Sequence, residues 1–231
     1  NVCGVDPELV LPNPHLSLLD GAVTAAGWGN IAAYGVLIGA GQFGLLFIAM
    51  REDITPGVAS IMVQTQAFFT IALAMVFLRE RLRRYQGVGL ALCLAGLVVL
   101  FANVDGSVTT RGLLLTLTGG LCWAVANLIA KRAGRVDMLG FMVWSSLFAI
   151  PPLLACSLWL EGAGAIGATL ADASWPAWAA AVWQGVANTL FGYGAWNWLL
   201  ARHPTAVIAP FSLLVPVVAM SISAILSHSE K

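Results

Sequence analysis

The chain alternates long apolar runs with short polar segments. A helix needs about 20 mostly apolar residues to cross the roughly 30 Å hydrocarbon core of a bilayer. Seven runs approach that length, near residues 28–50, 57–78, 85–103, 112–131, 138–160, 177–200 and 205–227. They lack the period-two alternation of strands, and lipid cannot satisfy an open sheet edge. The pattern predicts an all-α, polytopic transmembrane helical bundle.

Residues 1–27 differ from these runs because Pro7, Pro12 and Pro14 interrupt them among acidic side chains. We expect an irregular or interfacial lead-in there. The longest predicted loop, residues 161–175, contains no Lys or Arg. Cytoplasmic loops carry an excess of those residues, so this loop is expected to face outward.

Most of the basic residues fall on the opposite side of the predicted bundle. They are Arg79, Arg81, Arg83, Arg84, Lys131, Arg132, Arg135 and Arg202. That side is predicted to be the cytoplasm, which places a multi-pass protein in the inner (plasma) membrane of a bacterial cell.

Composition supports the membrane prediction and excludes several partners. The chain is 59% hydrophobic and 10% charged, with eleven basic and eleven acidic side chains. This balance provides no basic face for nucleic acid. The four Cys residues lack the spacing of a zinc site or redox motif, so neither a metal nor a cofactor is expected. The expected partners are the lipid bilayer and a small neutral or zwitterionic solute, and a homodimer is compatible with the sequence.

A weak internal repeat appears when the chain is compared with itself at a shift of 150 residues. The shift pairs Trp28 with Trp178, Gly35 with Gly185, Gly44 with Gly194, Ala59 with Ala209, Ala74 with Ala224 and Glu80 with Glu230. Because it spans five predicted helices, the second copy would be inverted in the membrane. Inverted repeats are typical of secondary transporters.

The middles of the predicted helices contain no Asp, Glu, Lys, Arg or His. Intramembrane ionisable groups usually mark proton relays and ion sites, and an intramembrane hydrolase needs a nucleophile or metal with its base. We therefore expect no catalytic residue and no enzyme activity.

Uncharged polar and aromatic residues remain as candidates for contact with a solute. The candidate substrate-binding residues are Gln42, Gln64, Gln66, Asn127, Tyr193, Trp196 and Asn197, with Asn188, Ser145, Ser146 and Ser212 as weaker candidates. The alternative for each amide is a helix-to-helix hydrogen bond that contributes about 0.6 kcal/mol. Gln64 and Gln66 are two residues apart on one helix, so both cannot point into the same cavity. Pro210 and Pro216 are candidate kinks of a gate.

Several motifs resemble the EamA family of the drug/metabolite transporter superfamily, and most closely its O-acetylserine/cysteine exporter branch. They are the stretch from Gln64 to Thr70, Glu80-Arg81-Leu82, Gln42-Phe43, Gly192 to Trp196, and Ala209 to Val218. The resemblance implies ten helices in two inverted halves of five. Residues 28–103 would then be the remainder of the first repeat, with three helices, and residues 112–231 the second, with four.

The chain departs from this family pattern in two respects. Arg79 stands where the family usually has Gly, and the equivalents of helices one, two and ten are not recognised. A chain truncated at both ends is therefore the expectation. The sequence favours a carrier that exports small amino-acid-related metabolites, similar to cysteine or O-acetylserine, by alternating access. The alternative is a truncated, non-transporting membrane protein or a partner-binding helical module.

Overall fold

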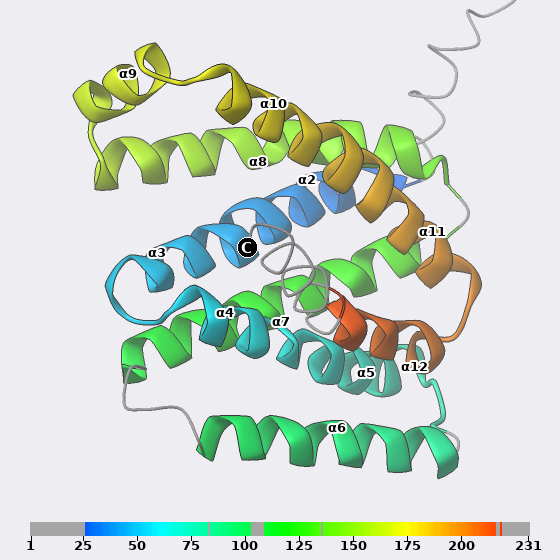
Figure 1. Ribbon diagram of the computed structural model, residues 1–231. Helices are drawn as coiled ribbons and strands as arrows, with labels where there is room; N and C mark the ends of the chain where they lie inside the picture. The colour runs from blue at the N-terminus through cyan, green and yellow to red at the C-terminus, as the bar shows by residue number, and fades with distance from the viewer. Residues whose placement is uncertain (1–25, 83, 103–108, 135, 216–217, 219–231) are drawn as a thin grey trace, which may run out of the picture.

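The computed structural model describes residues 26–82, 84–102, 109–134, 136–215 and 218 of the chain. Every regular element within these ranges is a helix, as Figure 1 shows. This confirms the predicted all-α bundle. Pro216 and almost all of the lead-in 1–27 lie outside the described residues.

The predicted runs all contain helix, although several are divided into pieces. The first comprises α2 (Trp28–Val36), a π-helix η2 (Leu37–Gly44) and α3 (Leu45–Glu52), and the second comprises α4 (Pro56–Val63) and α5 (Thr65–Leu78). The next three are α6 (Arg84–Ala102), α7 (Thr110–Ala133) and α8 (Met138–Leu160). The sixth comprises α10 (Trp175–Trp183), a π-helix η3 (Gln184–Tyr193) and α11 (Gly194–Arg202). The seventh begins with α12 (Thr205–Ile208) and the 3₁₀ helix η4 (Ala209–Leu213).

One helix was not predicted. Helix α9 (Ala163–Ala171) lies within the segment 161–175, which the sequence analysis treats as a loop. Its nine residues are rich in Ala, a strong helix former, but they are too few to cross a bilayer. A search for membrane-length runs therefore passes over it.

Four helices in the described part of the chain are long and apolar enough to cross a membrane. They are Trp28–Arg51, Val58–Leu78, Thr110–Ala133 and Met138–Leu160. Large apolar side chains such as Trp159 and Trp183 are exposed, whereas Gln66, Asn127 and Asn197 are buried. Apolar groups outside and amides inside suit a protein that lipid surrounds.

Helix α7 is the centre of the bundle and packs against α2, η2, α3, α4, α5 and α11 (Figure 1). Its neighbours approach closely at Gly119 and Gly120, where an added Cβ would lie 3.3 Å from the backbone oxygen of Gln42 and 3.0 Å from Oγ1 of Thr65, respectively. On α2 and η2, Gly35 and Gly39 similarly face α8, where added Cβ atoms would collide with Ser145 and Ala149. Small residues thus permit close packing of these helices.

Candidate solute-binding site

A pocket of about 600 Å³, the central pocket, lies among the first two spans, α7, the sixth span and η4. Its polar and indole lining comprises Gln42, Ser60, Gln64, Trp123, Asn188, Tyr193, Trp196 and Ser212. The apolar lining comprises Phe43, Leu46, Met50, Ala59, Val63, Gly192, Phe211 and Val215. None of these lining residues is charged.

The backbone departs from regular α-helix in four of the elements that form this pocket. The π-helix η2 carries Gln42 and Phe43, and the π-helix η3 carries Asn188, Gly192 and Tyr193. The second span breaks at Gln64, between α4 and α5, and the seventh changes to a 3₁₀ helix at η4. Pro210 lies in the first turn of η4, where its missing N–H is compatible with that change. At membrane depth, irregular backbone is tolerated where it lines a cavity or is buried in protein.

One side of the pocket adjoins a buried hydrogen-bond network, the polar floor, formed by Gln66, Thr70, Asn127, Trp196 and Ser212. Gln66 Nε2 donates to Ser212 Oγ at 2.8 Å, and Gln66 Oε1 accepts from Thr70 Oγ1 at 3.3 Å and from Asn127 Nδ2 at 3.4 Å. Asn127 Nδ2 also donates to Thr70 Oγ1 at 3.1 Å, and Asn127 Oδ1 accepts from Trp196 Nε1 at 3.1 Å. The network therefore joins α5, α7, α11 and η4.

The predicted site residues divide into two groups. Gln42, Gln64, Tyr193 and Trp196 line the central pocket, as do the weaker candidates Asn188 and Ser212. Gln66 and Asn127 are instead held in the polar floor, behind the lining. Gln64 and Gln66 thus point in different directions, in keeping with their spacing of two residues.

Asn197 lies apart from both groups. Its Nδ2 donates to the Tyr34 hydroxyl at 2.8 Å and contacts Met142 Sδ at 3.2 Å, and it is not among the lining residues. These contacts join α11 to α2 and α8. In this conformation Asn197 acts in packing.

Two polar atoms of the pocket residues are buried and lack a hydrogen-bond partner in the described structure. They are Oε1 of Gln42, whose residue is 2% exposed, and Nε1 of Trp123. An unsatisfied buried polar group costs about 1–3 kcal/mol, so each atom requires an explanation. Both residues belong to the lining of the central pocket, so these atoms lie next to the space that a solute would occupy.

Ionic and hydrogen-bonded contacts join the helices at one end of the bundle, which is called the inner end after the predicted orientation. Lys131 Nζ lies 2.8 Å from Glu80 Oε1, and Glu80 also accepts from the backbone N–H of Thr205 at 2.8 Å. Arg79, which ends α5, has a left-handed backbone with φ of 54°. Glycine adopts that conformation without steric cost, so Arg79 holds a strained backbone that a Gly at this position would relieve.

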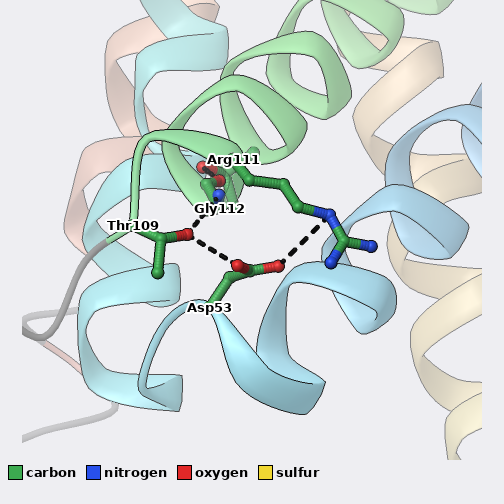
Figure 2. Close-up of polar contacts among 5 residues, drawn as sticks. Asp53, Thr109, Arg111 and Gly112 are labelled. Atoms are coloured by element: carbon green, nitrogen blue, oxygen red, sulfur yellow. Dashed lines mark hydrogen bonds and ion pairs between the residues drawn. The ribbon is translucent and has the colours of Figure 1, made fainter.

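A second cluster lies at the outer end, near the start of α7 (Figure 2). Thr109 Oγ1 donates to Asp53 Oδ1 at 2.6 Å and accepts from the N–H of Gly112 at 2.9 Å. Arg111 Nε lies 3.7 Å from Asp53 Oδ2, a distance of an ion pair without a hydrogen bond. With 1.5 Å of rise per residue, Arg111 and Lys131 are about 30 Å apart along α7.

The central pocket lies on the outer side of the polar floor. Its lining includes Met50, three residues before Asp53, and Ala59, in the first half of the second span. No residue of α5, which runs to the inner end, is part of the lining. The pocket therefore extends from the middle of the bundle toward the outer end, while the Glu80 cluster ties the inner end.

Sequence reasoning did not select several residues of this site. Trp123 was as compatible with packing as with solute contact, because one sequence cannot show where an indole N–H points. The contact of Thr70 with Gln66 could have been predicted, since Thr70 follows Gln66 by four residues and shares its helix face. In the sequence, Glu80 was part of a family motif and Lys131 was one of the basic residues that predict the cytoplasmic side. The fold brings these two side chains together.

Comparison with known proteins gives one family. Residues 11–102 and 110–230 match the EamA-like transporter family. The first match begins within the predicted lead-in 1–27.

Two proteins named as probable amino-acid metabolite efflux pumps are similar over most of the chain. That of Salmonella typhimurium (strain LT2) is 38% identical over 202 residues, and that of Escherichia coli (strain K12) is 35% identical over 202 residues. Each alignment covers 85% of this chain and 68% of the relative. One crystal structure of a protein matches with a TM-score of 0.63 at 19% identity, over 91% of this chain and 84% of the other. At that identity the match shows a shared fold.

Proposed function

The chain belongs to the EamA-like transporter family and is a multi-pass membrane protein, and from this premise we propose that it exports a small amino-acid-related solute through the central pocket. One observation carries the proposal: irregular backbone in η2, η3, η4 and at Gln64 borders an uncharged pocket at membrane depth. Transporters typically bind substrate where helices are discontinuous near the midplane. The names of the two relatives support export of amino-acid metabolites.

Gln42, Gln64, Tyr193 and Trp196 contact the solute in this proposal, because they line the pocket. Gln66, Asn127 and Asn197 support the site from behind, since their amides bond to other helices. The substrates we favour are small and neutral or zwitterionic, similar to cysteine or O-acetylserine. A solute with a net charge would meet no compensating charge in the lining.

Transport would proceed by alternating access in the bacterial inner membrane. In this proposal the described conformation faces outward in the predicted orientation, and the contacts of Glu80 with Lys131 and Thr205 at the inner end support it. Release of those contacts and closure at the outer end would expose the pocket to the cytoplasm. Residues 28–103 and 112–231 would rock against each other as inverted repeats. The shift of 150 residues supports this division, because it carries η2 onto residues 187–194, which overlap η3.

A bulky substitution in the pocket tests the proposal. Val63 lines the pocket, whereas Val76, on the same span, is 71% exposed. We expect Val63→Trp to reduce export of labelled L-cysteine or O-acetyl-L-serine from proteoliposomes about tenfold or more, since it fills the space that the solute needs. Val76→Trp is the matched control and should retain transport.

Equal transport by Val63→Trp and the wild-type protein would exclude the central pocket as the route. Absence of transport of every amino-acid probe by the wild-type protein would favour the non-transporting alternative.

A further inference from the structure

The two unpartnered atoms of the central pocket are of opposite chemical kinds. Gln42 Oε1 is a hydrogen-bond acceptor, and Trp123 Nε1 carries a hydrogen that it can only donate. A single solute that satisfies both must present a donor to Gln42 and an acceptor to Trp123. An apolar solute satisfies neither atom, whereas water or a polar solute with a donor and an acceptor can satisfy both.

Aromatic rings line the same pocket as these two atoms. The Phe43 and Tyr193 rings are 6.4 Å apart, and the Tyr193 and Trp123 rings are 5.9 Å apart, measured between centroids. Gln42 and Phe43 both line the pocket from η2. Aromatic faces attract a cation that has left water. An aromatic lining of this kind favours a solute whose hydrogen-bond donor carries positive charge.

The lining contains no charged side chain to balance a net charge on the solute. Burial of an uncompensated charge is costly, so a cationic donor needs an anion within the same solute. An α-amino acid meets this condition, because its ammonium and carboxylate groups are joined through one carbon. It also supplies the acceptor that the Trp123 indole requires.

We propose that Gln42 Oε1 accepts a hydrogen bond from the ammonium group of an α-amino acid and that Trp123 Nε1 donates one to its carboxylate. This inference rests on the proposed export function and names the chemical groups that its pocket recognises. Gln42 and Trp123 would then select free amino acids over derivatives that lack either charge.

Competition experiments with matched derivatives test the two contacts separately. The probe is whichever of labelled L-cysteine, L-serine and L-threonine the reconstituted protein transports fastest, and the competitors are its N-acetyl derivative and its carboxamide. The N-acetyl derivative lacks the ammonium group, and the carboxamide lacks the carboxylate. We expect the wild-type protein to prefer the free amino acid about tenfold or more over each.

Each pocket variant should weaken one of these two preferences and leave the other unchanged. Gln42→Met removes the amide at similar volume, and should lower the preference over the N-acetyl derivative about threefold or more while that over the carboxamide persists. The preference that remains reflects the net charge of the derivative, which the uncharged lining disfavours. Trp123→Phe removes the indole N–H and should show the reverse. Trp144→Phe is the control, because Trp144 Nε1 is also buried without a partner in the described residues but lies outside the pocket lining. It should change neither preference.

Two results would overturn the assignment while leaving transport intact. One is a wild-type protein that transports the amino acid but is inhibited equally by all three compounds. The other is a pair of variants that weaken recognition of all three compounds to the same extent. Failure of the wild-type protein to transport any probe would instead count against the proposed function itself. Size-exclusion profiles in detergent establish that each variant is folded before its preferences are compared.

Discussion

Gln42 and Gln66 are the same residue type, lie at similar depth and are almost equally buried, at 2% and 0% exposure. Their surroundings differ. Gln66 uses its oxygen and its nitrogen within the polar floor, where Ser212, Thr70 and Asn127 are its partners. Gln42 has an oxygen without a partner in the described structure, and it lines the central pocket. Burial alone therefore does not distinguish a structural amide from one available to a solute.

The state of each hydrogen-bonding atom makes that distinction only together with the position of the residue in the pocket lining. Asn197 Oδ1 and Trp144 Nε1 also lack a partner in the described structure, but they lie outside that lining. An amide that is already satisfied by neighbouring helices gains little from a solute, and its loss leaves those neighbours unsatisfied. An amide atom without a partner lowers the stability of the protein until a ligand binds to it, so it gains free energy from a solute. Substitution of Gln66 should therefore reduce stability, whereas substitution of Gln42 should leave it nearly unchanged.

Asn127→Leu should give the largest loss of stability, because Asn127 contacts three members of the polar floor. The substitution nearly preserves volume, but it leaves the Trp196 N–H without its acceptor and removes the donor to Thr70 Oγ1 and Gln66 Oε1. We expect the free energy of unfolding to fall by about 2–3 kcal/mol. Thermal and denaturant unfolding in detergent micelles measures the change. A decrease no larger than that of an exposed substitution would mean that the network contributes little.

Gln66→Met should have the next largest effect, a decrease of about 1–2 kcal/mol in the free energy of unfolding. It removes the acceptor for Thr70 and Asn127 and the donor to Ser212. The same unfolding assay applies. Solute affinity per folded molecule should change less than stability, since Gln66 lies behind the pocket lining. A selective loss of affinity with unchanged stability would place Gln66 in direct contact with the solute.

The contact between Gln66 and Ser212 should contribute a smaller, measurable coupling. These residues are 146 positions apart in sequence, and their side chains are 2.8 Å apart. A double-mutant cycle of Gln66→Met and Ser212→Ala should give about 0.6 kcal/mol, the average for hydrogen bonds between membrane helices. Strict additivity would show that the two side chains do not stabilise each other.

Gln42→Met should have the smallest effect on stability, within about 0.5 kcal/mol of the wild-type protein in the absence of solute. No described residue loses a hydrogen bond to its Oε1, because none is made. Stabilisation by added amino acid, measured as a shift in unfolding temperature, should nevertheless decrease. A large loss of stability without solute would show that Gln42 has a structural partner and would remove the contrast with Gln66.

The apolar runs were sufficient to predict the class of fold and the positions of its main helices. Lipid imposes a length and a composition on any helix that crosses it, and those requirements are local properties of the chain. The motifs around Gln64, Glu80 and Pro210 were likewise sufficient to identify the family. The sequence contained weaker indications of the π-helices η2 and η3, the 3₁₀ helix η4 and the break at Gln64. Helix α9 is too short to form an apolar run of membrane length.

Sequence alone also identified the uncharged polar residues at membrane depth, but it could not assign their partners. Gln64 and Gln66 could be separated by helical periodicity, yet which of the two faces the pocket depends on how the second span rotates against α7 and η4. Asn197 bonds to Tyr34, which is 163 positions away. Hydrogen bonds act over about 3 Å between residues that only the packed helices bring together, so the tertiary structure decided which amides are satisfied and which remain for a solute.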